Sequence, residues 1–166
     1  MATQDNLQAA FAGESQANRK YLAFAKQADA DGYRQIARLF RAAAEAETVH
    51  AHAHLRAMGG VRTTAENLQS AVDGEGFEFR EMYPPYLAEA QAAGHKSAAI
   101  SFKNALAVEQ VHHTLYSEAQ AAINAGKDLA AAPIFVCSVC GYTVNDAAPD
   151  KCPICGVPKD RFAEVR

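Results

Sequence analysis

The chain has 166 residues and a formal net charge of −3 at pH 7, enough for one ordinary domain with a small appendage. Its Lys and Arg residues are scattered and no run of about 18 apolar residues occurs, so neither nucleic acid nor a membrane is expected as a partner. The N-terminus MATQDNLQAA lacks the basic flank and apolar core of a secretory signal, so a cytoplasmic protein is expected.

Four helices are predicted in the first part of the chain, residues 1–130. This part is rich in Ala, Glu, Gln and Leu, with glycines where helices should end. Thr63 followed by Glu66 predicts a capping box at the start of the third helix. Pro84 and Pro85 predict a kink or break within that helix. The apolar spacing predicts helices at about 4–29, 32–58, 64–93 and 97–125.

The helical part contains an internal repeat. TQDNLQAAFAGE at 3–14 aligns without gaps on TAENLQSAVDGE at 64–75, with seven of the twelve positions identical. At nearly the same offset, FRAAAEAETVH at 40–50 aligns on FKNALAVEQVH at 102–112. A duplicated helical hairpin is therefore predicted, and the fold class expected of it is an all-α four-helix bundle.

Acidic and imidazole side chains stand on the apolar stripes of these helices. A buried carboxylate is costly unless it has a partner or a metal. One Glu from each of two helices plus Glu-x-x-His from each of two others is the ligand set of dinuclear metal sites in helical bundles. One Glu-x-x-His alone is usually a solvated surface pair, but two repeat-related pairs favour a metal site. The predicted ligands are Glu14, Glu47, His50, Glu75, Glu109 and His112.

Glu78 breaks the symmetry of the repeat, because its counterpart is Ala17. It shares a helix face with Glu75, and we interpret it as a fifth carboxylate that competes with a histidine when the oxidation state changes. A solvated helix acid is the alternative. Tyr21 and Tyr83 stand near the ligand positions, where they either donate hydrogen bonds to ligand carboxylates or fill the bundle.

The tail, residues 131–166, is a second and chemically different part. It reads CSVCGY…CPICG, and two C-x-x-C pairs in a cytosolic chain predict a tetrahedral metal site in place of disulfides. So short a segment buries little core, so the metal should supply much of its stability. A structural zinc ribbon has the same spacing, but the redox-metal bundle beside it favours iron. The predicted ligands are Cys137, Cys140, Cys152 and Cys155.

Five motifs together resemble rubrerythrin: FAGESQA, AEAETVHAHAH, GEGFEFREMYP, VEQVHH and the terminal CSVCGY…CPICG. They span almost the whole chain in the family's order. The resemblance implies a ferritin-like di-iron bundle at 1–130 and a rubredoxin-like domain at 131–166. It implies two iron ions in a carboxylate site and one iron ion in a four-cysteine site, where zinc can substitute.

The resemblance also implies a role for each ligand. Glu47 and Glu109 would bridge the two irons. Glu14 would bind one iron, together with Glu78 in the oxidised state and His50 in the reduced state. The other iron would be held by Glu75 and His112, and the tyrosines near the di-iron centre would be Tyr21 and Tyr83.

The activity implied by the resemblance is reduction of hydrogen peroxide to water. Electrons would come from NAD(P)H through separate reductase proteins or rubredoxin, and the four-cysteine iron would relay them. A homodimer or higher homo-oligomer is expected, commonly head-to-tail. Two alternatives remain open from the sequence. One is a ferritin-like ferroxidase or oxidase that uses dioxygen, and the other is a non-enzymatic zinc-ribbon module.

Overall fold

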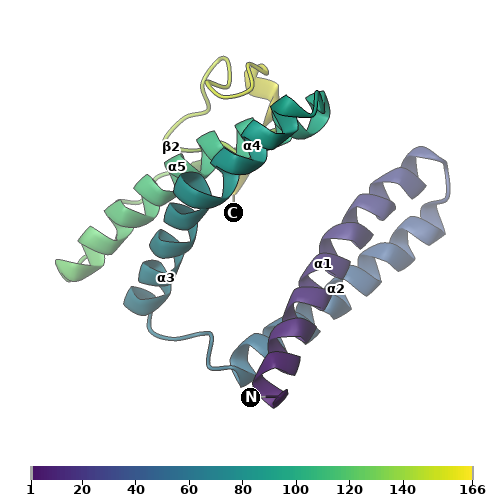
Figure 1. The fold of residues 1–166 in the computed structure, drawn as a ribbon, viewed down its shortest axis with the longest axis horizontal. Coiled ribbons are helices and arrows are strands. Elements are labelled where there is room, and N and C mark those ends of the chain that lie inside the picture. The colour runs from purple at the N-terminus through teal and green to yellow at the C-terminus, as the bar shows by residue number, and fades with distance from the viewer. Residues whose placement is uncertain (1, 166) are drawn as a thin grey trace. The chain divides into compact units, whose positions relative to one another are not determined.

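The computed structural model describes residues 2–165. The chain forms two compact units, one ending at Arg62 and the other beginning at Thr63, and each is described by itself (Figure 1). Within the described residues, no helix has both the length and the apolar character that crossing a membrane requires.

The first unit is a hairpin of two helices, α1 at Ala2–Ala30 and α2 at Arg34–Ala57. Gly32 in the turn has φ of 87°, a left-handed conformation that glycine adopts without steric cost. The N–H of Tyr33 then bonds to the carbonyl oxygen of Ala28 at 2.8 Å, which closes the end of α1. The small side chains buried in this hairpin are Ala25, Ala28, Ala37, Ala44 and Ala51.

The second unit begins with another helical hairpin. Thr63 caps its first helix, because its hydroxyl accepts the N–H of Glu66 and its own N–H donates to the Glu66 carboxylate at 3.1 Å. The predicted capping box is therefore confirmed. Gly94 in the turn has φ of 67°. The elements are α3 at Thr64–Phe77, the π-helical turn η1 at Glu78–Met82, α4 at Tyr83–Ala92 and α5 at Lys96–Asn124.

The second hairpin is one residue longer than the first. Repeat partners Glu14 and Glu75 are 61 positions apart (75 minus 14), whereas Gly32 and Gly94 are 62 apart (94 minus 32). The turn η1 lies between these points. The N–H of Tyr83, just after it, bonds to the carbonyl oxygen of Glu78, five residues back. Such a turn takes up an extra residue without ending the helix. The prolines that follow lie in the first turn of α4, so the third predicted helix is interrupted as expected, but at Glu78–Met82, just before the prolines.

Each hairpin carries the same cluster of three aromatic rings at repeat-related positions. Ring centroids are 5.6–6.3 Å apart in the first cluster and 5.7–6.5 Å apart in the second. The predicted duplication is thus visible in three dimensions as well as in sequence. The rings are Tyr21, Phe24 and Phe40 in the first hairpin and Tyr83, Tyr86 and Phe102 in the second.

The tail is a small antiparallel sheet with strand order β2-β1-β3. Its strands are β1 at Ile134–Cys137, β2 at Thr143–Asn145 and β3 at Phe162–Val165, and a 3₁₀ turn, η2 at Lys159–Arg161, precedes β3. The sheet has little core of its own, and the fully buried side chain in it is that of Cys137. The loop after β1 packs against α5, where a Cβ at Gly141 would lie 3.7 Å from Val108.

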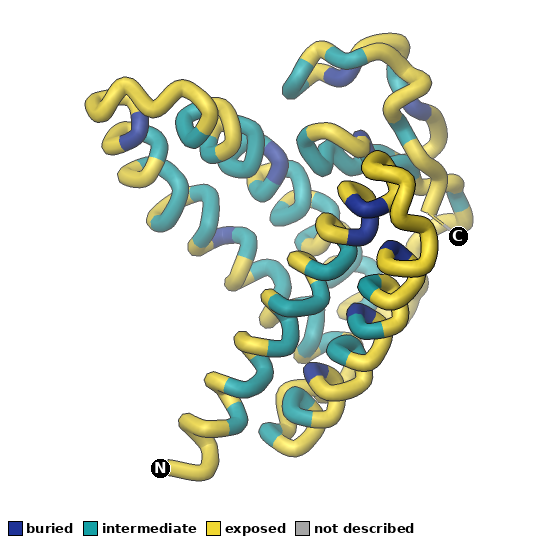
Figure 2. The backbone as a smooth tube through the Cα atoms, turned by 90° about the vertical axis from the view of Figure 1, so that its right-hand side faces the viewer, coloured by how far each residue is buried: buried dark blue, intermediate teal, exposed yellow. Residues whose placement is uncertain are grey.

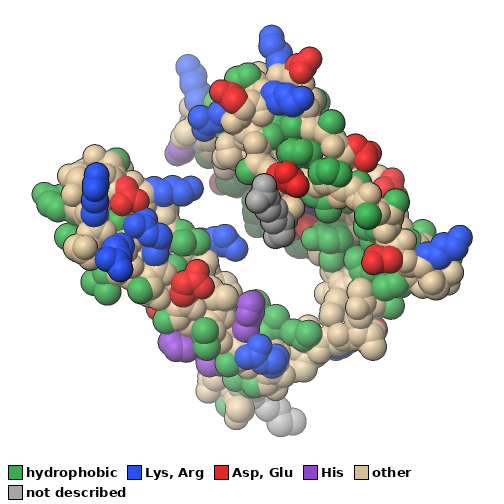
Figure 3. Space-filling view, turned by 180° about the vertical axis from the view of Figure 1, so that it is seen from behind, with side chains coloured by type: hydrophobic (Ala, Val, Ile, Leu, Met, Phe, Trp, Pro, Cys, Tyr) green, Lys and Arg blue, Asp and Glu red, His purple; other side chains and the backbone are tan. Residues whose placement is uncertain are grey.

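Packing within the helical hairpins relies on small side chains. Figure 2 shows buried positions occurring singly along the helices, and most of them are alanines. Larger apolar side chains stay exposed, including Ile36 and Leu39 in α2 and Ile100 in α5. Figure 3 shows apolar side chains interspersed with charged ones along the helices. Each hairpin therefore retains apolar surface for further contacts.

Candidate metal centres

The first cluster of possible metal ligands lies in the first hairpin. Glu14 comes from α1, and Glu47 and His50 come from α2. Nδ1 of His50 lies 2.9 Å from a carboxylate oxygen of Glu47 and 3.9 Å from one of Glu14. One donor atom of each residue lies within 4.8 Å of the other two. Next to them, Asn18 donates to Thr48 Oγ1 at 2.9 Å and ties the two helices together.

The second cluster has the same geometry in the second hairpin. Glu75 comes from α3, and Glu109 and His112 come from α5. Nδ1 of His112 lies 2.7 Å from a carboxylate oxygen of Glu109 and 3.9 Å from one of Glu75. In both clusters Nδ1 faces the acids, so three residues from two helices present oxygen and nitrogen donors to one point. The structure therefore brings the six predicted ligands together as two groups of three.

The second cluster is more enclosed than the first. The side chain of His112 is 26% exposed, whereas that of His50 is 55% exposed. Burial raises the pKa of Glu75 to about 7, and the hydrogen bond and charge of Glu109 and the charge of Glu78 add to this. Acids this crowded repel each other unless a proton or a cation lies between them. The donor set therefore fits a metal cation, which displaces the proton and removes the repulsion.

Glu78 lies outside these groups of three, at the first position of η1. Its pKa is raised by burial and by the negative charge of Glu109, so its carboxyl group lies close to the second cluster. The pKa of Tyr83 is raised by burial and by the charges of Glu78, Glu109 and Glu75. The Tyr83 hydroxyl therefore stays protonated beside the acids. Tyr21 occupies the matching position in the first hairpin, within its aromatic cluster.

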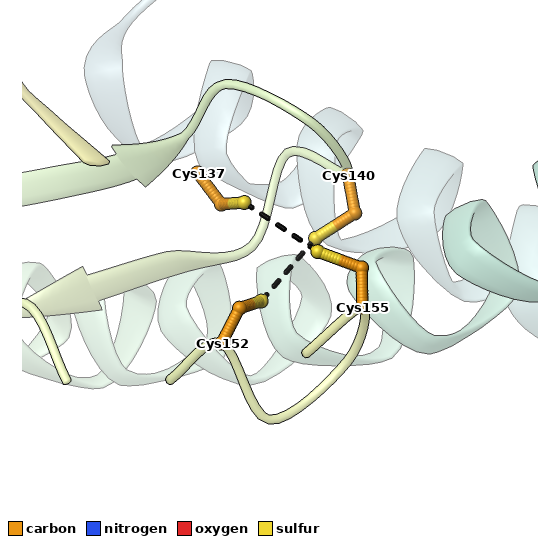
Figure 4. Close-up of side chains that lie close together, drawn as sticks. All are labelled: Cys137, Cys140, Cys152 and Cys155. Atoms are coloured by element: carbon orange, nitrogen blue, oxygen red, sulfur yellow. Dashed lines mark hydrogen bonds between the residues drawn. The ribbon is translucent and has the colours of Figure 1, made fainter. Parts of the chain in front are cut away.

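The four cysteines converge on one point in the tail, and their sulfur atoms point toward each other from two loops (Figure 4). Sγ of Cys137 lies 3.7 Å from Sγ of Cys155, and Sγ of Cys140 lies 3.5 Å from Sγ of Cys152. All four are free thiols. A tetrahedral ion with metal–sulfur bonds of about 2.3 Å holds its sulfurs about 3.8 Å apart. The geometry therefore fits one tetrahedral metal ion, as predicted.

The backbone around the cysteines is built to stabilise thiolates. Gly141 and Gly156 follow the second cysteine of each pair with φ of 87° and 75°, which turns the next amides toward sulfur. Burial alone would raise the pKa of Cys152, but hydrogen bonds from the N–H groups of Cys155 and Ile154 and from the neighbouring thiols outweigh it and lower the pKa to about 7. Burial raises the pKa of Cys140. A metal ion resolves this conflict, because it holds all four sulfurs as thiolates.

The tail also contacts the second cluster directly. Nε2 of His112, the ring nitrogen that faces away from the acids, lies 3.0 Å from Oγ1 of Thr143 on β2. Oγ1 of Thr143 in turn donates to the carbonyl oxygen of Gly141 at 3.1 Å. Sequence reasoning missed Thr143, because a threonine three positions after a cysteine carries no signal of its own. Its role follows only from the packing of β2 on α5.

Comparison with known families gives matches for both parts of the chain. The family model for rubrerythrin matches residues 5–120, and the model for the rubredoxin-like domain of rubrerythrin matches residues 135–163. The chain belongs to the rubrerythrin family. This confirms the predicted family and the predicted fold class, a ferritin-like helical part followed by a small rubredoxin-like domain. The boundary placed at residue 130 stays a prediction.

Individual relatives agree over nearly the full length. The chain is 37% identical to rubrerythrin-2 of Clostridium acetobutylicum, over 96% of this chain and 95% of that one. It is 38% identical to nigerythrin of Nitratidesulfovibrio vulgaris, over 97% and 85%. A solved structure described as the fully reduced, all-ferrous state of nigerythrin matches 98% of this chain and 86% of its own, with 36% identity and a TM-score of 0.59.

Family membership and the donor clusters agree on the metals. Carboxylate oxygens and imidazole nitrogens suit iron in both common oxidation states, and four thiolates suit a single iron or zinc ion. The protein is a di-iron protein with a rubredoxin-like four-cysteine site, as predicted, and its family is one of oxidoreductases. Which residue binds which iron stays a prediction.

Proposed function

We propose that the protein is a non-haem iron peroxidase that reduces hydrogen peroxide to water and protects against oxidative stress. The two clusters would contribute to one di-iron site, and the four cysteines would hold the iron that relays electrons. The proposed di-iron ligands are Glu14, Glu47, His50, Glu75, Glu78, Glu109 and His112, with Tyr21 and Tyr83 beside them.

One observation carries this proposal. Two Glu–Glu–His groups with matching distances occur in one chain with a four-cysteine group. A structural metal needs only one closed site, whereas a redox reaction that consumes two electrons needs a reacting centre and an entry for electrons. The pairing of a carboxylate-rich centre with a thiolate centre meets both needs.

The ligands have distinct tasks in this proposal. Glu47 and Glu109 would each help to hold both irons, and Glu14 and Glu75 would each balance the charge of one. His50 would hold one iron in its ferrous state and Glu78 would hold it in its ferric state, because a ferric ion prefers carboxylate oxygen and a ferrous ion accepts imidazole. When bound, the irons supply the electron pair that the O–O bond takes up.

Reduction of hydrogen peroxide to two waters also consumes two protons, and the chain offers groups to deliver them. Glu78 and Tyr83 both have pKa values raised by burial and by neighbouring carboxylates. A carboxyl group with a raised pKa keeps its proton to higher pH than an ordinary glutamic acid and can donate it, and a tyrosine hydroxyl can pass a proton on through hydrogen bonds. These two groups therefore hold protons beside the second cluster.

The proposed reaction also needs a source of electrons, and the protein is proposed to act as an oligomer. Electrons would come from NAD(P)H through a separate reductase or rubredoxin and enter at the cysteine site. Rubrerythrins are commonly oligomeric, and a homodimer or higher homo-oligomer fits the apolar side chains that stay exposed on each hairpin.

The proposal is tested by reducing the iron-loaded protein without oxygen and mixing it with hydrogen peroxide or with dioxygen. The absorbance of the iron–thiolate centre reports reoxidation. Return of this colour at least ten times faster with peroxide supports a peroxidase whose sites exchange electrons. Equal rates, or faster return with dioxygen, would instead indicate an oxidase or ferroxidase. Absence of the colour in a preparation with full iron content would make the tail a structural module.

A further inference from the structure

The contact between His112 and Thr143 joins the two metal-binding parts of the second unit. His112 belongs to the second cluster, and Thr143 belongs to the sheet that carries the cysteines. Nε2 of His112 lies 3.0 Å from Oγ1 of Thr143. His50, the repeat partner of His112, has a side chain that is more than half exposed.

The direction of this hydrogen bond suits a metal-binding histidine. When Nδ1 gives its lone pair to a metal, Nε2 must carry the proton and needs an acceptor. The hydroxyl proton of Thr143 is directed to the carbonyl oxygen of Gly141 at 3.1 Å, which leaves a lone pair on Oγ1 for the proton on Nε2. The threonine therefore accepts from the tautomer that carries its proton on Nε2 and leaves the Nδ1 lone pair for a metal.

The position of Thr143 is fixed from both sides. Thr143 pairs with Val136 in the antiparallel ladder, and Cys137 N–H bonds to the carbonyl oxygen of Tyr142 at 2.9 Å. On the helix side, Val108 lies one turn before His112, is only 2% exposed and faces Gly141. The threonine is thus held by the same loop that presents Cys137 to its metal.

We propose that Thr143 is a positioning residue for the di-iron site: it accepts the Nε2 proton of His112 and fixes the tautomer and orientation of that ring. Stability of the cysteine site is thereby linked to ligand geometry at the second cluster within one chain. This inference rests on the proposed role of His112 as an iron ligand.

The expected size of the effect follows from the surroundings. Loss of a hydrogen bond to a metal-ligating histidine typically lowers metal affinity by about 10–100-fold. A cavity of about 350 Å³ adjoins the contact and is lined by Leu68, Leu115, Tyr116 and Ile134 among others. Water in this cavity can replace part of the lost bond, so the lower end, about tenfold, is expected.

The test compares Thr143→Val, which keeps the shape and removes the hydroxyl, with Thr143→Ser, which keeps the hydroxyl. Thr114→Val is the matched control, since that exposed hydroxyl donates to the carbonyl oxygen of Gln110 within α5. Two measurements are made on full-length protein. Chelator competition gives iron retention at the carboxylate site, and NMR of the zinc-loaded protein follows exchange of the imidazole N–H protons with solvent.

Thr143→Val is expected to weaken iron retention at the carboxylate site about tenfold and to speed exchange of the Nε2 proton of His112. Thr143→Ser and Thr114→Val should match the unmodified protein, as should the iron–thiolate absorbance of all three variants. The inference is overturned if Thr143→Val keeps both iron retention and slow Nε2 exchange. His112→Ala separates the two proposals: if it retains both carboxylate-bound irons, the assignment of His112 as a ligand itself fails.

Discussion

The two halves of the helical part differ less in geometry than in surroundings. In both, the distances from the histidine Nδ1 to the two acids are alike, 2.9 and 3.9 Å for His50 and 2.7 and 3.9 Å for His112. The second half additionally has Glu78, a π-helical turn and the hydroxyl of Thr143. The two halves therefore present similar donor groups in chemically different surroundings.

The π-helical turn explains how this difference was built into a helix. One extra residue enters the second hairpin between Glu75 and Gly94, and η1 absorbs it. The residue at its start is Glu78, the acid without a partner in the first hairpin. A rare helical turn at a metal site is a common sign of function, since its distorted backbone re-aims a side chain. The asymmetry of the site is therefore encoded in backbone as well as in side chains.

The largest expected effect comes from removing the acids that lie closest to the histidines. Glu47→Ala and Glu109→Ala should each abolish iron binding at the carboxylate site and reduce peroxide reduction to background, because each acid is proposed to contact both irons. Iron analysis and stopped-flow peroxide reduction check this. Iron at the cysteine site serves as an internal standard and should be unchanged. Loss of activity in only one of the two variants would contradict equivalent bridging roles.

A smaller effect is expected on the pH dependence of stability, which should reflect the acids of the second cluster. The pKa of Glu75 is raised from its usual 4.5 to about 7, first by burial and then by Glu109. Between these values the folded, metal-free protein binds more protons than the unfolded chain, so its stability falls as pH rises from about 5 to 7. Urea unfolding of the metal-free protein at several pH values measures this, and Glu75→Gln should flatten the dependence.

Loading the protein with zinc provides the control for the pH experiment. A bound cation competes with the Glu75 proton, so the metal-loaded protein should gain stability over the same pH range. If Glu75→Gln leaves the pH dependence of the metal-free protein unchanged, another group is responsible for it.

The smallest expected effect tests whether the hairpins are equivalent away from the metals. Gly32 and Gly94 both have positive φ, and a Cβ at either position meets no other atom within 4 Å. An alanine at either position would therefore add backbone strain but no steric clash. Gly32→Ala and Gly94→Ala should each lower the free energy of unfolding by about 1 kcal/mol. Amide hydrogen exchange near each turn reads the two costs separately. If the two losses of stability differ by more than about 1 kcal/mol, the two turns do not contribute equally to the stability of their hairpins.

Much of this architecture could be predicted from local sequence patterns. The capping box at Thr63 and the convergence of the four cysteines depend on spacing within a short segment, and both are confirmed. The grouping of His112 with Glu109 follows from a three-residue spacing on a helix. These features are determined by nearby residues, which is why a single sequence suffices for them.

Other features depend on packing between distant segments. The contact of Thr143 with His112 joins residues 31 positions apart, and no periodicity in either segment indicates it. The raised pKa of Glu75 likewise depends on burial and on Glu109 from another helix. The prolines at 84 and 85 predicted an interruption of the helix, but not that a π-helical turn would provide it.

The central proposal is that the two clusters hold the two irons of the di-iron centre in unequal surroundings. Anomalous diffraction at the iron edge from crystals of the anaerobically reduced protein tests it most directly. The account predicts, for each cysteine-bound iron, a pair of iron peaks about 3.5–4 Å apart, one beside His50 and the other beside His112. Two separate irons that do not share a carboxylate, or iron at only one cluster, would contradict it.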